Sequence, residues 1–246
     1  MSRLLFIFAL TIAFSLTCGS AAPGIAADTN GVTHRVSLTW VVNNPPAGPW
    51  DVYLQSAVVP PGSWPGPHTH PGPEYGFVLS GIYTRWNEGA SFSVRPSQRF
   101  FTPMGVIHEG GNASDGEVVF YGTHILAAGG QFAIPADPAL APGAPKIAPG
   151  QITIYRIKFP LVNHPTPPFK LTMEILDFTE AGQTPVHSPP GILLGVVMSG
   201  RLSVMQNGTL TTYGPNQGFQ VPPSATFSLA SADGAPASVA LSLLGS

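Results

Sequence analysis

The sequence predicts an all-β protein that contains two antiparallel barrels in tandem. Gly and Pro occur 28 times each among the 246 residues without a collagen period, which is typical of many short strands joined by turns. Apolar and polar residues alternate over short segments such as 52–54, 77–79 and 91–94, as in half-buried strands. The segments 73–81 and 192–200 share Gly, Val, Ser and Gly at one offset of 119 residues, and this repetition predicts two copies of one architecture.

The composition excludes several classes of function. Hydrophobic residues make up 43% of the chain, enough for a sizeable core, so the protein is not disordered as a whole. Charged residues make up only 9%, with 10 Lys and Arg against 12 Asp and Glu, so neither a nucleic-acid surface nor a polybasic membrane patch is expected. The expected partner is instead a small-molecule ligand or substrate.

Residues 1–27 have the pattern of a secretory signal peptide. A charged residue precedes an apolar run over 4–16, which is short for a membrane span, and small residues follow. Cleavage is expected between Ala21 and Ala27, which places the mature protein in a bacterial periplasm or outside the cell, with no membrane anchor and no disulfide. A lipoprotein attached through Cys18, the one cysteine, is the less favoured alternative.

The first copy, expected over residues 32–126, carries the side chains with metal chemistry. His68 and His70 are two residues apart, so on a strand both imidazoles point to one face, and Glu74 keeps the same parity. His108 follows a turn marked by Pro and Gly, and closure of the strands into a barrel brings its side chain to the same interior. Three neutral imidazoles and one carboxylate suit one divalent transition metal (Fe, Mn, Ni, Cu or Zn) better than Ca or Mg.

Two spaced motifs in this copy resemble those of the cupin family. The motifs consist of Gly62, His68-Thr69-His70, Glu74 and Gly81, and of Pro103-Met104-Gly105, His108 and Asn112. The leading glycine of the second motif is absent, and Ser97 stands in its place at a turn. The resemblance implies a jelly-roll-like barrel (a double-stranded β-helix) in which His68, His70, Glu74 and His108 are the ligands of one metal ion.

Further polar residues are candidates for catalysis or substrate contact. Glu74 is the candidate catalytic residue, as a ligand that loosens and acts as a base. Arg85 is notable in a chain so poor in charge and could hold an anionic substrate beside the metal; the alternative is an exposed strand arginine. Tyr53 and Gln55 are weaker candidates to face the cavity. Three histidines outside the motifs are expected to be solvated or satisfied: His34, His124 and His164. Of these, His124, near the end of the first copy's last strand, is the one to watch.

Residues 127–150, rich in Pro and Ala, are expected to form an extended linker to a second barrel over 151–246. That copy keeps His187, but Pro189, Leu193 and Phe227 replace the other three ligands. One imidazole among apolar residues is not a transition-metal site. We therefore expect this degenerate barrel to serve packing, or to narrow the mouth of the first barrel; an apolar ligand pocket at Leu193 and Phe227 is the alternative.

Two classes of function follow from this site. The first is a metal-dependent enzyme acting on a small organic substrate, with a dioxygenase favoured over a lyase or an isomerase, because the weakly charged surroundings suit dioxygen and a chelating substrate. The second is a secreted protein that binds a metal or small ligand without turnover. Fold alone does not select between them. A homodimer is a further expectation.

Overall fold

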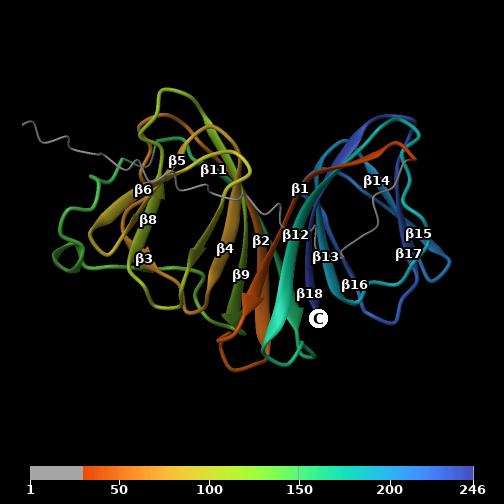
Figure 1. Ribbon diagram of the computed structural model, residues 1–246, viewed down its shortest axis with the longest axis horizontal. Helices are drawn as coiled ribbons and strands as arrows, with labels where there is room; N and C mark the ends of the chain where they lie inside the picture. Colours follow the sequence, from red (N-terminus) through yellow and green to blue (C-terminus); the bar gives the residue numbers. More distant parts are fainter. Residues whose placement is uncertain (1–29, 149, 246) are drawn as a thin grey trace, which may run out of the picture.

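The computed structural model describes residues 30–148 and 150–245, and these form two β-barrels that lie side by side (Figure 1). The strands of the first repeat are β1 (Val32–Val42), β2 (Trp50–Val59), β3 (His68–Thr69), β4 (Glu74–Ser80), β5 (Tyr83–Asn87), β6 (Ala90–Val94), β7 (Arg99–Thr102), β8 (His108–Gly111) and β9 (Val118–Ala127). Short β10 (Ile134–Pro135) and the 3-10 turn η1 (Pro138–Leu140) follow. The second repeat contains β11 (Thr153–Leu161), β12 (Phe169–Phe178), β13 (Gly191–Ser199), β14 (Leu202–Gln206), β15 (Thr209–Tyr213), β16 (Gly218–Val221), β17 (Phe227–Ser231) and β18 (Ala237–Gly245).

The predicted all-β fold with tandem barrels is confirmed. The first barrel consists of the sheets β11-β2-β9-β4-β7 and β10-β3-β8-β5-β6, and the second of β1-β12-β18-β13-β16 and β15-β14-β17. The predicted signal peptide and Cys18 lie outside the described residues. Within the described part of the chain, no helix is long and apolar enough to cross a membrane.

The two repeats exchange their first strands. Strand β1 pairs along the whole length of β12 in the second barrel, and β11 pairs in the same way with β2 in the first barrel (Figure 1). The predicted boundaries, 32–126 and 151–246, therefore follow the sequence repeat but not the sheets. The sequence repeat could not reveal the exchange, because β1 and β11 are equivalent edge strands of the two repeats. The apolar pattern of each strand is compatible with pairing in either barrel.

The barrels are joined by a shared apolar core. On the first barrel's large sheet, the face opposite to the barrel interior carries Trp50, Leu54 and Phe77, which pack in one cluster with Leu171 and Met173 of the second barrel's large sheet. Within this interface Thr123 and Ser242, equivalent positions of the two repeats, are joined by a 2.8 Å hydrogen bond between their hydroxyl groups. Burial of these apolar side chains between the barrels stabilises the two barrels as one unit. We therefore expect that neither barrel folds alone.

Turn residues define the ends of the strands as the sequence predicts. Glu88 and Gly89 between β5 and β6 have positive φ of 44° and 92°, and Asn207 and Gly208 between β14 and β15 have 48° and 79°. Positive φ at both central residues is the requirement of a tight hairpin turn whose twist matches the strands. Ser97, which stands where the cupin motif has glycine, also has a positive φ of 64°. The position therefore keeps the conformation that glycine prefers.

Replacing Ser97 by glycine is expected to raise the free energy of unfolding by about 0.5–1 kcal/mol, because glycine adopts positive φ without a Cβ clash. The Ser97 side chain is exposed and its backbone N–H donates to Val78, a bond that glycine keeps. Urea unfolding measures the change. The matched control is Ser93→Gly within β6, also exposed, which is expected to destabilise; a loss of stability in Ser97→Gly would contradict this account.

Candidate metal centre

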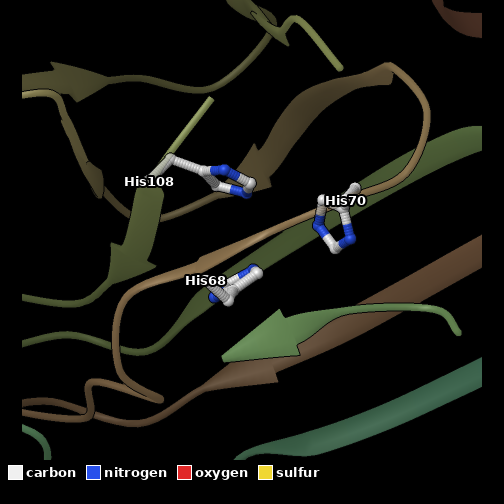
Figure 2. A group of neighbouring side chains, drawn as sticks. All are labelled: His68, His70 and His108. Atoms are coloured by element: carbon white, nitrogen blue, oxygen red, sulfur yellow. The ribbon is translucent and has the colours of Figure 1, made fainter. Parts of the chain in front are cut away.

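Three histidines converge inside the first barrel. His68 of β3 lies in register with His108 of β8, and His70 follows β3 directly. Each of the three offers a ring nitrogen within 4.8 Å of the other two (Figure 2). His68 and His70 reach one face of the chain, as two residues of equal parity do on a strand. The structure thus brings together the three imidazoles that the motifs single out.

The hydrogen bonds of these rings fix which nitrogen is free. The Nδ1 atoms of His68, His70 and His108 lie 2.9, 2.7 and 2.9 Å from backbone carbonyl oxygens, those of Gly66, Phe132 and Val106 respectively. A carbonyl oxygen only accepts, so each Nδ1 must carry the proton and donate it. In the neutral ring Nε2 is then left with its lone pair. This tautomer, with the proton on Nδ1, is one that metal-binding histidines adopt when a carbonyl or carboxylate accepts a hydrogen bond from the ring nitrogen that does not bind the metal.

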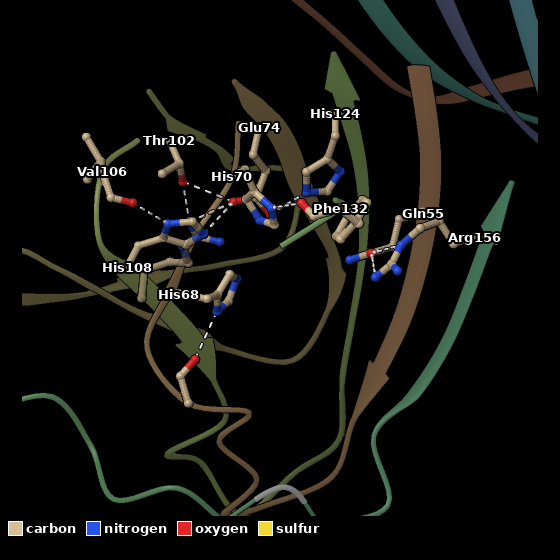
Figure 3. A network of polar contacts seen from close by, with 12 residues as sticks. Gln55, His68, His70, Glu74, Thr102, Val106, His108, His124, Phe132 and Arg156 are labelled. Atoms are coloured by element: carbon tan, nitrogen blue, oxygen red, sulfur yellow. Dashed lines mark hydrogen bonds and ion pairs between the residues drawn. The ribbon is translucent and has the colours of Figure 1, made fainter. Parts of the chain in front are cut away.

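Glu74, at the start of β4, adds a carboxylate to the cluster. Its Oε2 lies 3.5 Å from Nε2 of His108 and accepts hydrogen bonds from Arg85, at 2.9 Å, and from the hydroxyl of Thr102, at 3.0 Å (Figure 3). Burial by itself would raise the pKa of the Glu74 carboxyl, but the Arg85 guanidinium holds that pKa well below its usual range. Glu74 is therefore ionised, the form that is required both of a metal ligand and of the predicted base.

His124 is a site residue that the sequence pointed to but did not place among the predicted metal ligands. It lies on β9 in register with Glu74, and its Nε2 is 3.5 Å from Glu74 Oε1, so that His70, Glu74 and His124 form a second group of converging donors. A signal for its inward orientation was present in the repeat, because the equivalent position of the second copy is the apolar Leu243. His34 and His164 belong to neither group.

Several ring nitrogens at this site make no hydrogen bond, although Glu74 oxygens lie 3.5 Å from two of them. Among the described residues, Nε2 of His108 and both ring nitrogens of His124 are buried without a hydrogen bond. An unpaired buried polar atom costs about 1–3 kcal/mol. A metal ion would use such lone pairs, and the donor set of imidazoles with one carboxylate is that of a transition-metal site. The residues present therefore fit one metal ion.

Burial keeps the imidazoles neutral. Burial lowers the pKa of His70 from 6.5 to about 4 and that of His108 to about 3, and it lowers the pKa of His68 and His124 as well. At neutral pH these rings are unprotonated, as metal ligands must be.

These shifts predict that the metal-free protein loses stability in acid. The unfolded chain binds protons to its histidines below pH 6.5, whereas folded His70 and His108 resist protonation until about pH 4 and 3, so stability falls as the pH is lowered from 6.5. At pH 5 each of these histidines accounts for a loss of about 2 kcal/mol. Urea unfolding at pH 7.5 and pH 5 measures it, and equal free energies would contradict the prediction. His70→Ala should show a smaller pH dependence.

A cavity of about 460 Å³ opens beside the cluster. Gln55 and Arg85 line it, as does Arg156 of β11, whereas Tyr53 is not among its lining residues and packs its ring edge against Phe132 at 5.1 Å. Residues 127–150 are more than the expected linker, since β10 pairs with β3 and the Phe132 carbonyl holds His70. The cavity of the first barrel is thus lined partly by this linker and partly by β11 from the second repeat.

The second barrel lacks such a site. Leu193, Val204, Phe227 and Leu243 occupy the positions of Glu74, Arg85, His108 and His124, and all four are buried in its apolar core. The space beside His187 is only about 30 Å³, which is room for roughly one water molecule. An apolar ligand pocket at Leu193 and Phe227, the alternative from the sequence, therefore has no room for an organic ligand.

Comparisons with known proteins agree with this architecture. Residues 56–128 match the family described as "Cupin domain". The chain is similar to the crystal structure of AerE from Microcystis aeruginosa, with 13% identity, a TM-score of 0.51, and 87% and 99% of the two chains covered. It is also similar to a variant of Bacillus subtilis oxalate decarboxylase (13%, TM-score 0.54, 86% and 74%) and to Lactobacillus farciminis oxalate decarboxylase in a formate complex (14%, 0.55, 90% and 88%). No curated protein matches the sequence.

Residues 56–128 match the cupin domain, and the chain as a whole has the fold of two tandem cupin barrels. Its first barrel contains His and Glu groups that could hold one metal ion, and apolar residues stand at the equivalent positions of the second barrel.

Proposed function

We propose that the first barrel binds one divalent transition metal through His68, His70, His108 and Glu74. The observation that supports this most is the shared tautomer of the three imidazoles, each of which donates from Nδ1 to a backbone carbonyl and keeps Nε2 free. Nitrogen ligands suit Fe, Mn, Ni, Cu or Zn. Mn is a reasonable first choice for reconstitution, because a structure of Bacillus subtilis oxalate decarboxylase similar to this chain is described as having Mn(II) centres.

We further propose that this centre is the active site of a metal-dependent enzyme acting on a small organic substrate, with dioxygenase chemistry favoured. When bound, the metal would supply Lewis acidity and, if redox-active, electron transfer. The apolar part of the lining, which includes Ala57, Val59 and Phe120, offers water no hydrogen-bonding side chain beside the reacting groups. Arg85 and Thr102 hold the Glu74 carboxylate in its ionised form and in one orientation.

Oxalate decarboxylation is the less favoured activity, although oxalate decarboxylases are among the similar structures. The charge of buried Arg85 is paired with Glu74, which makes Arg85 a weaker partner for an oxalate dianion than an unpaired arginine; its role as a substrate ligand stays a prediction. The largely apolar wall of the cavity suits a substrate with a hydrocarbon body better than a small dianion.

The proposed setting is the bacterial periplasm or the exterior, reached by removal of residues 1–27, with a small molecule as partner. Low charge and the lack of a basic surface support this proposal over nucleic-acid or membrane partners. The homodimer stays a prediction.

The test combines metal analysis with turnover. The purified protein is loaded with Fe, Mn, Ni, Cu or Zn in turn, and oxygen uptake is recorded with a panel of small phenols and diketones. Substrate-dependent uptake that is lost after chelation and restored by one metal supports the dioxygenase. Bound metal without uptake, and without any new product by mass spectrometry, would favour a binding protein instead.

A further inference from the structure

Arg156 of β11 lies at the mouth of the cavity with its guanidinium fixed in place. Its Nε and Nη2 donate to Oε1 of Gln55 at 2.9 and 2.7 Å, and its charged carbon lies 3.4 Å from the centre of the Phe132 ring. Gln55 is buried and lies between Arg156 and the histidine cluster (Figure 3). Arg156 itself is solvent-accessible. A charged group held at an open mouth is placed to meet an entering ligand.

The charge of Arg156 is not balanced within the cavity. Among the described residues that line the cavity, Glu74 is the one carboxylate, and it is paired with Arg85. Arg156 has an ordinary hydrogen-bond partner in the neutral Gln55 but no anionic one. The mouth is therefore electropositive, and a bound metal ion would add to that charge.

The remaining donors suit a carboxylate. Gln55 uses only Oε1 towards Arg156, and no hydrogen bond among the described residues uses its Nε2. A planar guanidinium beside an amide N–H donor matches the oxygens of a carboxylate. Behind this pair the wall is hydrocarbon, formed by Ala57, Val59, Phe120, Ile152 and Ile154.

We propose that Arg156 and Gln55 bind the carboxylate of an organic monoanion whose apolar body fills the cavity towards the metal centre. The inference rests on the proposed function for the role of this molecule as substrate, but binding can be measured without turnover. The second barrel provides an internal comparison. There the register pair equivalent to Arg156 and Gln55 is Ser37 and Glu174, with a buried acid that disfavours an anion.

Isothermal titration calorimetry tests the proposal with four carboxylates, benzoate, phenylacetate, 3-phenylpropionate and hexanoate, each against its neutral amide. The protein is used as isolated and again after removal of metal, so that binding to Arg156 is separated from binding to a metal. Wild type is expected to bind at least one carboxylate more tightly than its amide. Arg156→Gln is expected to weaken that carboxylate tenfold or more in both states and to leave the amide unchanged.

Two further variants test whether the guanidinium group matters and whether the effect is specific to Arg156. Arg156→Lys keeps the positive charge but not the planar guanidinium with its several N–H donors. This variant is therefore expected to retain part of the affinity for the carboxylate. Lys158→Gln is the matched control, because Lys158 lies two residues along β11, contacts Asp51 and is not among the cavity-lining residues; its binding should equal that of wild type. No preference of wild type for any carboxylate over its amide, or equal carboxylate affinity in Arg156→Gln, would overturn the proposal. Carboxylate binding without oxygen uptake would leave the anion site standing and reject only the oxygenase.

Discussion

His68→Ala is expected to contain at least tenfold less metal per chain than wild type after reconstitution with one equivalent of Mn or Fe. Mutation of a residue that only hydrogen-bonds to a metal ligand typically lowers the metal affinity by about 10–100-fold, and removal of a ligand itself costs at least as much. The ring of His68 is one of three that converge within 4.8 Å, so its removal takes one donor from the proposed ligand set. Elemental analysis of the folded variant, with circular dichroism to verify the fold, gives the answer.

His187→Ala is the matched control for this experiment. His187 occupies the equivalent position of the second repeat, and its Nδ1 lies 2.9 Å from the Pro185 carbonyl, as that of His68 does from Gly66. The local setting of the two rings is therefore the same, and only their neighbours across the barrel differ. His187→Ala should retain the full metal content. Loss of metal from this variant, or full retention in His68→Ala, would contradict the ligand assignment.

Arg85→Val is expected to lower the free energy of unfolding of the metal-free protein by about 3–5 kcal/mol, because it leaves the Glu74 carboxylate buried without its counter-ion. The side chains of Arg85 and Glu74 are only 2% and 4% exposed and lie 2.9 Å apart. Arg85 also donates to Thr102 and lies over the Phe100 ring at 4.7 Å, contacts that the variant loses as well. Urea unfolding at pH 7.5 measures the change.

The second barrel supplies the control for this pair. Its equivalent positions hold Val204 and Leu193, so the double variant Arg85→Val with Glu74→Leu reproduces an arrangement that this fold already packs. Removing both charges leaves no unpaired carboxylate, and the double variant should recover most of the stability lost in Arg85→Val. A double variant less stable than Arg85→Val would show that the cost comes from lost packing and not from the unpaired charge.

Sequence patterns were sufficient to predict most of the fold. The offset of 119 residues relates β2 to β12 and β9 to β18, because the same alternation and the same turn residues recur in both repeats. The exchange of β1 and β11 could not be predicted in this way. Which barrel an edge strand joins depends on its connection and on the apolar face it buries between the barrels, and both are properties of the folded chain.

The candidate site was predictable only where its residues belong to one local pattern. His68, His70 and Glu74 are close in sequence with strand parity, and His108 belongs to a recognisable second motif. His124 and Arg156 are isolated in sequence, and they reach the cavity because β9 pairs with β4 and because β11 crosses to β2. For Arg85 the sequence indicated proximity to the metal but not its partner, since a buried pair with Glu74 depends on the three-dimensional register.

The structure also gives the second repeat a defined role. Its barrel has replaced the ligand positions by Leu193, Phe227 and Leu243, and it packs through a large apolar interface against the first barrel. It contributes β11, and with it Arg156, to the mouth of the first cavity. The expectation that the second copy narrows this mouth stays a prediction, and β11 is the strand through which it would do so.

The central claim, one metal ion in the first barrel, is tested most directly by anomalous X-ray diffraction from crystals of the metal-loaded protein. Data collected on both sides of the absorption edge of the metal identify and locate it. We predict one anomalous peak per chain, within coordinating distance of Nε2 of His68, His70 and His108. A peak beside His187, or no peak in the first barrel at full metal loading, would contradict it.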